Sequence, residues 1–407
     1  MIGDILHERY HIVDKLGFGG YSTVWLARDT RLAQYVALKV GLADPDSDSL
    51  RREIKALQAL SAHLPSVSST SQQQQRQHRG PHSIPVPLDE FEVHGPNGIH
   101  PCYTRAPAQC NLREVSYSRL FQLDVARALS GGLALAVAYV HSQGYVHGDI
   151  HLRNILLRLP SGFNPVSAEN LYEIYGEPET VPITPCNNND PLPVNVLTKA
   201  VLAPHLGRRA EKYTLSEVGE GLLLSDFGEA FKPALGLQQG KDCHTPLAFR
   251  VPEAYFEPQA SLSYPSDIWS LATAIWEILG MEAIFSLERT DIDKIVSQQV
   301  DLMGPLPLHW WEGWERRSQF FNEDRKPTEG RYVWPPIDEA FEEGVQKYRR
   351  MDGMGEFGKE ETSAILDLMR RMLAFCPEDR PTAEEVLKSE WMAKWALPEF
   401  ERSLQMR

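Results

Sequence analysis

The segment from His147 to Asn154 constrains this chain most, because it sets a carboxylate, Asp149, and a carboxamide, Asn154, five positions apart in a turn-rich stretch. A second carboxylate, Asp226, opens an Asp-Phe-Gly tripeptide further along the chain. Phosphoryl transfer needs one carboxylate to orient the attacking hydroxyl, and a neutral oxygen ligand and a second carboxylate for Mg²⁺. The two segments together supply these three groups.

The composition is that of an ordinary globular chain with an acidic balance. The 407 residues are 42% hydrophobic and 24% charged, which allows a sizeable core and more than one domain. A formal net charge of −14 disfavours general binding to nucleic acid, whose phosphates require Lys and Arg. It is compatible with basic peptide substrates, but plain solubility is the more common reason for such a charge. We therefore expect no direct nucleic-acid partner.

The five cysteines are scattered, with no CxxC pair and an odd total. This pattern suits a reducing compartment and argues against a disulfide framework or a zinc site. The first residues show no secretory signal, and the most apolar windows, near Leu129–Val140 and Ile268–Leu279, are shorter than a membrane span. We expect a monomer in the cytoplasm, the nucleus or both, without a membrane.

Short strands dominate the first hundred residues. Strand-like runs at Tyr10–Leu16, Val24–Ala27 and Tyr35–Val40 alternate with turns, and further strands surround the turn Gly95–Gly98. At Asp48–Leu60 the apolar residues fall on a helical stripe behind a Ser/Asp-rich start. The sequence thus predicts an antiparallel sheet with one amphipathic helix.

From about Leu120 the pattern becomes mostly helical, with a break at Gly131-Gly132 and a strand at Leu156–Leu159. Between this strand and Asp226 the chain is rich in Pro and Asn. That composition predicts an insertion with at most one helix, near Val196–His205.

A glycine-rich turn lies between the first two strands, from Gly17 to Val24. Its small residues let backbone amides approach a triphosphate without steric conflict. It lacks the Gly-Lys-Ser/Thr of a Walker A loop. A hairpin with extra glycines is an equally good explanation of this segment taken alone.

Taken together, these segments resemble the protein kinase superfamily. The segment His147–Asn154 is similar to its catalytic loop, and Asp226–Gly228 to its metal loop. The glycine-rich turn Gly17–Val24 is similar to its glycine-rich loop, and Val36–Lys39 to the strand that carries its nucleotide-binding lysine.

The resemblance implies roles for single residues. Lys39 would grip the α- and β-phosphates of ATP, with Glu53 as its ion-pair partner. Asp149 would be the catalytic base or orienter, and Asn154 and Asp226 would hold Mg²⁺. Further contacts to ATP are expected from Gly17, Phe18, Gly19, Gly20, Tyr21, Ser22, Val24 and Ala37.

Two positions of the segment His147–Asn154 depart from the family pattern. Gly148 stands where the family usually has Arg, the common receptor for an activation-loop phosphate, so we expect activity without that phosphorylation. His151 stands where the family usually has Lys near the γ-phosphate. Because an imidazole titrates near neutral pH, we count His151 among the catalytic residues and expect turnover to fall as the pH rises through the neutral range.

Three later segments resemble the peptide-binding platform of protein kinases: Phe249–Glu253, Ser266–Leu271 and Pro377–Thr382. The likeness implies that Asp267 ties down the backbone of the catalytic loop. It also implies that Arg380 pairs with Glu253.

Several passages are similar to the SR-protein kinases, which phosphorylate serines in Arg/Ser-rich tracts of splicing factors. They are Leu16–Ala27 with Trp25, Phe91–Cys102, Arg250, Met303–Pro307 and the placement of the insertion after the catalytic loop. The resemblance implies a protein substrate of this kind. It also implies an acidic substrate groove, in which Asp291, Asp293 and Asp301 would bind Arg side chains. A solvated helix face is the alternative reading of these three residues.

The resemblance further implies a two-lobed α+β fold with ATP in the cleft between the lobes. We expect a β-rich N-lobe over residues 1–106 with a low-complexity loop at 61–83, an α-helical C-lobe over 107–400 with the insertion at 160–220, and a tail at 401–407. His147 and Phe227 would stack with Leu57 as a column that links the lobes.

Two other functions stay open on the sequence. Gly148 and His151 would also suit a pseudokinase, a scaffold with little or no turnover. The His-Gly-Asp-Ile-His pattern also resembles aminoglycoside and choline kinases, which phosphorylate small-molecule hydroxyls. We favour an ATP-dependent serine/threonine protein kinase, because the metal- and phosphate-binding groups are all present and the later segments resemble a peptide platform.

Overall fold

The computed structural model describes residues 2–43, 49–62, 80–116, 120–159, 163–164, 166–185, 191–192, 196–219, 221–236, 238–280, 282–286 and 291–406. The chain forms two compact units. The first comprises Met1–His63, Pro85–Cys110 and Leu157–Gly207, and the second comprises Leu64–Ile84, Asn111–Leu156 and Arg208–Arg407. This grouping differs from the predicted domain boundaries, because most of the insertion belongs with the N-terminal residues.

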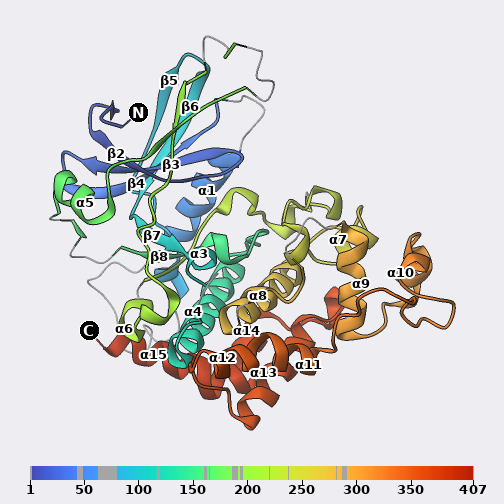
Figure 1. Cartoon of the computed structure of the whole chain (residues 1–407). Helices are drawn as coiled ribbons and strands as arrows, with labels where there is room; N and C mark the ends of the chain where they lie inside the picture. Colours follow the sequence, from blue (N-terminus) through green and yellow to red (C-terminus); the bar gives the residue numbers. More distant parts are fainter. Residues whose placement is uncertain are drawn as a thin grey trace. The chain divides into compact units, whose positions relative to one another are not determined.

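A six-stranded antiparallel sheet forms the centre of the first unit, in the order β1-β2-β3-β4-β6-β5 (Figure 1). The strands are β1 (Ile5–Leu6), β2 (Tyr10–Phe18), β3 (Ser22–Asp29), β4 (Gln34–Gly41), β5 (Asp89–Gly95) and β6 (Gly98–Arg105). Alternate side chains, among them Ile12, Ala27 and Leu38, are buried in one apolar core. The predicted strands and the turn between β5 and β6 are confirmed.

The predicted amphipathic helix is α1 (Ser49–Ser61), which buries Leu50, Ile54, Leu57 and Leu60 as the stripe requires. Its expected Ser/Asp-rich start falls within residues 44–48, outside the described residues. The same holds for residues 63–79 of the low-complexity segment. The residues that follow, Gly80–Ser83, form a 3-10 turn.

In its described residues the insertion adds one helix and one strand pair to the first unit, and a short helix, α6 (Leu215–Val218), to the second unit. The prediction of at most one helix is therefore wrong. The elements in the first unit are α5 (Ala168–Tyr175), β9 (Thr180–Pro182) and β10 (Lys199–Val201). The helix predicted near Val196–His205 is wrong, because residues 199–201 pair with β9 as a strand. The observed helix α5 has about two turns and one fully buried residue, Leu171, so its apolar stripe is too short to signal a helix in the sequence.

Helices make up most of the second unit (Figure 1). Its two long apolar helices, α4 (Leu123–Ser142) and α8 (Tyr264–Leu279), contact each other. The other helices are α3 (Leu112–Ser116), α6 (Leu215–Val218), α7 (Glu253–Phe256), α9 (Ile292–Met303), α10 (Leu308–Gly313), α11 (Ile337–Phe341), α12 (Lys347–Met351), α13 (Lys359–Met372), α14 (Ala383–Lys388) and α15 (Leu397–Gln405). α15 includes most of the residues that were expected as a tail.

A small second sheet has the strand order β11-β8-β7. Its strands are β7 (Ala108–Asn111), β8 (Ile155–Arg158) and β11 (Leu222–Leu224). β8 directly follows the catalytic loop, as predicted, and β11 ends two residues before Asp226. The small sheet therefore contains the strands next to both segments with candidate metal ligands, Asn154 and Asp226.

Helix α4 runs without interruption through Gly131 and Gly132, where a break was predicted. A Cβ on Gly131 would lie 2.8 Å from the carbonyl oxygen of Ala396, and a Cβ on Gly132 would lie 2.7 Å from the ring of Phe400. The two glycines thus permit close packing of the C-terminal segment, and this tertiary contact outweighs their low helix propensity.

By length and composition α4 would also be able to cross a membrane. In the structure 72% of its most apolar window is buried. α4 thus serves as a core helix of the second unit.

Candidate active site

Lys39 and Glu53 form a buried ion pair in the first unit. The Lys39 Nζ on β4 lies 2.6 Å from Glu53 Oε2 on α1, and their side chains are 9% and 2% exposed. The Tyr103 hydroxyl on β6 donates to Glu53 Oε1 at 2.9 Å, and Tyr103 lies opposite Lys39 in the β4–β6 register. Burial, followed by the Glu53 charge, raises the pKa of Tyr103, so its hydroxyl stays protonated. The predicted ion pair is present and has an additional donor that the sequence did not indicate.

The glycine-rich segment forms the turn between β2 and β3, as predicted. A Cβ added to Gly17, Gly19 or Gly20 would meet no heavy atom within 4 Å, and none of the three has a positive φ. The local backbone therefore gives no reason for glycine at these positions. Phe18 and Tyr21 are exposed. The three glycines leave their backbone open to a ligand, as the sequence predicted for this turn.

In the second unit, Asp149, His151 and Asn154 lie together on the catalytic loop. The Asn154 side-chain amide donates to the Asp149 carbonyl at 2.9 Å and to Asp149 Oδ2 at 3.0 Å. Asp149 Oδ1 is buried and has no hydrogen-bond partner among the residues that the structure describes. An unpartnered carboxylate oxygen held by a fixed neighbour is suited to accept the hydroxyl of a substrate.

His151 is buried beside the same carboxylate. Its Nε2 lies 3.5 Å from Asp149 Oδ2 and 3.4 Å from Asn154 Nδ2. Its ring centroid is 5.5 Å from that of Phe249. The imidazole therefore packs within the catalytic loop, next to the group expected to receive the substrate hydroxyl.

The residues predicted to bind a metal fit a hard divalent cation. Because Asn154 Nδ2 donates to Asp149, its Oδ1 is the side-chain atom left to act as an oxygen ligand. Asp226 follows Ser225, whose N–H and hydroxyl both bond the Asn154 carbonyl, at 2.8 and 3.0 Å. Asp226 itself has left-handed backbone angles, φ 66° and ψ 71°, which Asp tolerates better than most residues.

No group of three or more His, Cys, Asp or Glu side chains in the described ranges is arranged to hold a metal ion by itself. Mg²⁺ usually takes one or two protein ligands together with nucleotide phosphates and water. Asn154 and Asp226 would be such a pair.

Asp267 on α8 fixes the backbone of the catalytic loop. Its Oδ2 accepts the His147 N–H at 2.7 Å and lies 2.9 Å from His141 Nε2, and its Oδ1 accepts the Gly148 N–H at 2.9 Å. Burial alone would raise the pKa of Asp267, but the His141 hydrogen bond, the nearby His charges and the Gly148 N–H together lower it. The predicted role of Asp267 is confirmed, and His141 is a partner that sequence reasoning missed.

The catalytic loop also contacts the metal loop. The rings of His147 and Phe227 meet edge to face, 4.6 Å between centroids, and His147 Nε2 lies 3.1 Å from the Ser225 carbonyl oxygen. The predicted stacking of His147 and Phe227 is therefore present. Leu57 belongs to the other compact unit, and its place in the column stays a prediction.

Gly148 has φ +80°, a backbone conformation that strains residues with a Cβ. A Cβ there would lie 2.8 Å from the Glu229 carbonyl oxygen. The Arg that the family usually carries would meet both obstacles in this conformation. Gly148 is thus required by the local backbone.

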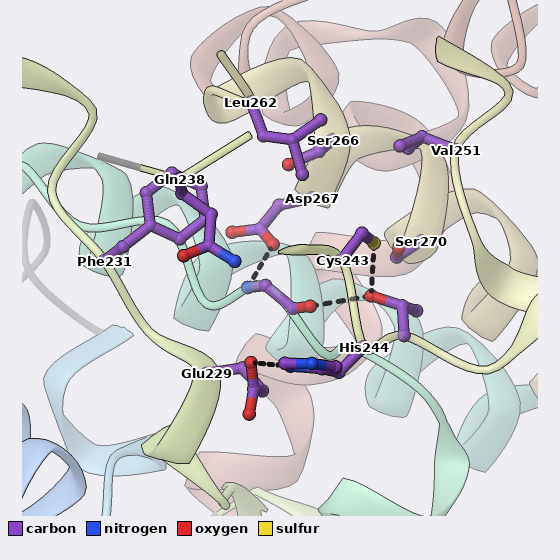
Figure 2. A pocket seen from close by; sticks show the side chains of 12 residues that line it. Glu229, Phe231, Gln238, Cys243, His244, Val251, Leu262, Ser266, Asp267 and Ser270 are labelled. Carbon is purple, nitrogen blue, oxygen red and sulfur yellow. Dashed lines mark hydrogen bonds and ion pairs between the residues drawn. The ribbon is translucent and has the colours of Figure 1, made fainter. Parts of the chain in front are cut away.

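The activation segment after Asp226 is held by contacts without a phosphate. The Thr245 hydroxyl donates to the Gly148 carbonyl at 2.7 Å. His244 Nδ1 lies 2.9 Å from Glu229 Oε2 (Figure 2). The same region encloses a cavity of about 10 Å³, room for about one water molecule. Nothing in the sequence motifs indicated Thr245, because its partner is a backbone carbonyl.

The segments that resemble the peptide platform are joined as predicted. Arg380 donates from Nη1 and Nη2 to the two oxygens of Glu253, each at 2.7 Å, and both residues are buried. The Arg380 guanidinium also lies over the Trp269 ring, 5.1 Å from its centroid. This two-bond ion pair fixes the end of the activation segment at α7.

The expectation for Asp301 is wrong. Its two oxygens accept Arg331 Nη1 and Nη2, each at 2.6 Å, and its side chain is 2% exposed. Asp293 is buried as well, and accepts from the Tyr255 hydroxyl and from Trp314 Nε1. Of the three predicted groove carboxylates, Asp291 stays about half exposed, at the start of α9.

A groove of about 340 Å³ lies beside Asp293. Its lining residues combine aromatic rings with carboxylates: Tyr255, Phe256, Glu257, Asp293, His309, Trp310, Gly313, Glu315 and Arg316. Glu257 and Glu315 are exposed there. Sequence reasoning missed both residues, because they come from different elements and share no local pattern.

Comparison with known proteins agrees with this geometry. The pattern of the protein kinase domain matches residues 10–163 and 214–392. A serine/threonine protein kinase of Aspergillus fumigatus is 25% identical over 408 residues, which cover 96% of this chain and 86% of that protein. The serine/threonine-protein kinase SRPK of Physarum polycephalum is 24% identical over 412 residues, with 96% and 88% covered.

Human SRSF protein kinase 3 is 30% identical over 161 residues, 38% of this chain and 26% of that protein. The crystal structure of a kinase domain shares the fold, with a TM-score of 0.63 at 15% identity over 96% of this chain and 97% of that one. Protein kinases use ATP and a divalent metal ion. The chain belongs to the protein kinase family and is a serine/threonine protein kinase similar to the SR-protein kinases.

Proposed function

We propose that this kinase transfers the γ-phosphoryl group of Mg²⁺-ATP to serine hydroxyls in Arg/Ser-rich or otherwise basic protein segments. The observation that carries the proposal is the unpartnered oxygen of Asp149, held in place by Asn154 beside the metal loop. A carboxylate so placed orients a hydroxyl for attack on a phosphorus atom.

We assign each group one task. Asp149 orients the serine hydroxyl and accepts its proton as the bond from the serine oxygen to the γ-phosphorus forms. The bond between that phosphorus and the β–γ bridging oxygen breaks at the same time, and ADP is the leaving group. Asn154 and Asp226 hold Mg²⁺, which neutralises phosphate charge when it is bound. Lys39, held by Glu53, pairs with the α- and β-phosphates, and the glycine-rich loop offers backbone N–H groups to them.

The choice of a basic substrate rests on two observations. The relatives include proteins named as SRSF protein kinase and SRPK. The groove beside Asp293 combines exposed Glu257 and Glu315 with the rings of Tyr255, Phe256 and Trp310. Arg side chains pair with carboxylates and stack on aromatic rings. The net charge of −14 is compatible with the same class of partner.

We further propose that activity does not require phosphorylation of the activation segment. Gly148 offers no cationic receptor for a phosphate. The bonds of Thr245 and His244 already hold the segment. We place the protein in the cytoplasm, the nucleus or both, as a monomer, in line with a protein substrate.

The test is a peptide-library phosphorylation assay with Mg²⁺-ATP, using protein made in a host without kinases and verified as unphosphorylated. We expect incorporation into Ser, with a preference for neighbouring Arg. ATP binding without incorporation, equal to that of an Asp149→Asn variant, would instead identify a pseudokinase. Phosphorylation of amino-alcohols but not of peptides would identify a small-molecule kinase.

The groove has its own test within this assay. Combined Glu257→Gln and Glu315→Gln substitution should raise the KM for an Arg/Ser peptide about tenfold, since two charge-assisted contacts are lost. The KM for an Arg-free peptide should stay the same. Glu312→Gln, which neutralises an exposed neighbour outside the lining, is the control. Equal KM values in all three proteins would remove the groove from the proposal.

A further inference from the structure

Strand β2 carries two bulges just before the glycine-rich loop. Opposite β3, Ile12 pairs with Ala27 and Asp14 with Leu26, so Val13 is an extra residue between them. A second shift lies between Lys15 and Gly17. Bulges bend a strand and leave a residue outside the ladder, and they are common beside functional sites. The direction in which the loop leaves the sheet is therefore set at these two points.

The insertion supplies a partner at the first bulge. The Tyr172 hydroxyl on α5 donates to the Val13 carbonyl oxygen at 2.8 Å. Burial raises the pKa of Tyr172, which keeps the hydroxyl protonated as a donor. Figure 1 shows α5 beside the strands β2 and β4. A side chain far along the chain thus satisfies the carbonyl that the bulge takes out of the ladder.

Apolar packing holds α5 in this place. Leu171 on α5 is fully buried, and it forms one cluster with Phe163, Val13, Leu26 and Tyr35. Two of these residues come from the insertion and three from strands β2, β3 and β4. The area that this cluster removes from water keeps the helix against the sheet.

Polar contacts add to this packing at the start of β4. The Tyr35 hydroxyl donates to the Val166 carbonyl at 3.0 Å, and the Tyr35 N–H donates to Asn164 Oδ1 at 3.1 Å. Arg28 Nη1 donates to the Asn164 carbonyl at 2.6 Å. The beginning of the insertion is therefore fixed to β3 and β4 by backbone as well as side-chain groups.

The insertion also contacts the second bulge. Lys15 Nζ donates to the Val201 carbonyl on β10 at 3.1 Å. The same Nζ lies 4.2 Å from the ring centroid of Phe18, at the tip of the glycine-rich loop. Lys15 thus connects the insertion to the ring of Phe18, which is 74% exposed.

We propose that the insertion positions the glycine-rich loop for the nucleotide, with Tyr172 and Lys15 as the positioning residues. α5 fixes the first bulge through Val13, and β10 fixes the loop base and tip through Lys15. Neither residue has to touch ATP for this role. The inference rests on the proposed role of the loop in binding ATP, and it assigns to the insertion a part in that binding.

The competing explanation is that these contacts only pack the insertion on the sheet. The positioning role and the packing role predict different effects of small substitutions on the Kd for ATP. Tyr172→Phe removes only the hydroxyl, and Lys15→Met removes the charged amino group but keeps an unbranched, apolar side chain of nearly the same length. If the contacts position the loop, each variant should raise the Kd for ATP about two- to tenfold, the range of one hydrogen bond. The kcat at saturating ATP and the KM for peptide should stay within twofold of the unmodified protein. A purely structural role would lower the thermal stability and leave the Kd for ATP unchanged.

Matched controls come from the same elements. Tyr175→Phe changes a tyrosine one turn along α5, and Lys199→Met changes an exposed lysine on β10. Both controls should bind ATP as the unmodified protein does. An equal increase in Kd for Tyr172→Phe and Tyr175→Phe would contradict a specific role for the bond to Val13.

A second measurement separates failure of this inference from failure of the proposed function. Hydrogen–deuterium exchange of residues 17–24, in protein without nucleotide, should be faster in Tyr172→Phe and Lys15→Met than in their controls. Unchanged exchange together with unchanged Kd would overturn the positioning role. If the unmodified protein binds no ATP, the proposed function fails, and the exchange rates alone still decide whether the insertion holds the loop.

Discussion

The catalytic loop and the glycine-rich loop are held by different means. A buried carboxylate fixes the catalytic loop, since Asp267 accepts the backbone N–H groups of His147 and Gly148. The tip of the glycine-rich loop is exposed at Phe18, and its contacts with the insertion lie at its base in β2. Groups that orient reacting atoms thus sit on a backbone fixed by the core. The segment expected to cover the nucleotide is anchored at its base and stays open to a ligand.

The largest effect should come from replacing Asp226, the candidate Mg²⁺ ligand on the segment that contacts the fixed catalytic loop. Asp226→Asn should lower turnover about 1000-fold, because a bound metal stabilises transition-state charge by several kcal/mol and each 1.4 kcal/mol is a factor of ten. Initial rates over a range of Mg²⁺ concentrations would measure it. Asp324→Asn changes an exposed carboxylate of the same unit and should have no effect. A rate within threefold of the unmodified protein would exclude Asp226 from the metal site.

Removing the anchor of the catalytic loop should affect both stability and rate. Asp267→Asn should lower the free energy of unfolding by about 2–4 kcal/mol, since a buried carboxylate with three donors is lost. Turnover should fall at least tenfold. Chemical denaturation and initial rates would measure the two effects.

The pH dependence of this stability loss has a definite sign. The pKa of Asp267 is lowered in the folded state, so its contribution is present above the unfolded pKa of about 3.9 and is lost as the pH falls through the folded pKa. The stability difference between Asp267→Asn and the unmodified protein should therefore shrink below about pH 4. As a control, Asp301→Asn removes another buried carboxylate, which pairs with Arg331. This variant should lose stability but keep its turnover. Equal losses of turnover in both variants would contradict the anchoring role.

The conformation of Gly148 predicts a smaller effect with a close control. Gly148→Ala should destabilise the protein by about 2–3 kcal/mol, since it adds backbone strain and a 2.8 Å approach to the Glu229 carbonyl. Gly144 has a similar φ of +78° with open space around a Cβ. Gly144→Ala should therefore cost about 1–2 kcal/mol, the backbone strain alone. Equal losses in the two variants would show that the activation segment moves aside at Gly148.

The smallest effect should appear in the pH profile of turnover. We expect the rate to fall as the pH rises between about 6 and 8, because an imidazole stands where the family usually has a permanently charged Lys. His151 Nε2 lies 3.5 Å from Asp149 Oδ2. His151→Lys should give a flat profile, and His151→Gln a lower, flat one. A profile of the unmodified protein that is already flat in this range would exclude the charge of His151 from catalysis.

The sequence predicted well what depends on short segments in a fixed order. The ion pairs Lys39–Glu53 and Arg380–Glu253 and the anchor Asp267 are implied by the resemblance to protein kinases, and the structure contains all three. Each belongs to a short segment that matches a motif of that family. The strands β2 to β4 and helix α1 were predicted because their apolar residues repeat with the right period.

What the sequence did not predict depends on partners distant along the chain. A solvated helix face was one reading of Asp301 from the sequence, but in the fold Arg331 pairs with Asp301 and buries its side chain. Gly131 and Gly132 favour a break locally, but close packing against the C-terminal segment keeps α4 continuous. Tyr103 reaches Glu53 because of the β4–β6 register, and Tyr172 reaches Val13 because α5 packs on the sheet. None of these pairings leaves a local pattern.

The most direct test of the account is a single-turnover measurement of phosphoryl transfer from γ-labelled ATP to a serine of an Arg/Ser peptide. Unmodified protein and Asp149→Asn would be compared at saturating ATP, Mg²⁺ and peptide. We predict transfer by the unmodified protein and a rate lower by about 100- to 10,000-fold in the variant, the range for loss of a positioned acid or base. Equal rates in the two proteins, or no transfer by either, would contradict the assignment of Asp149 and with it the proposed mechanism.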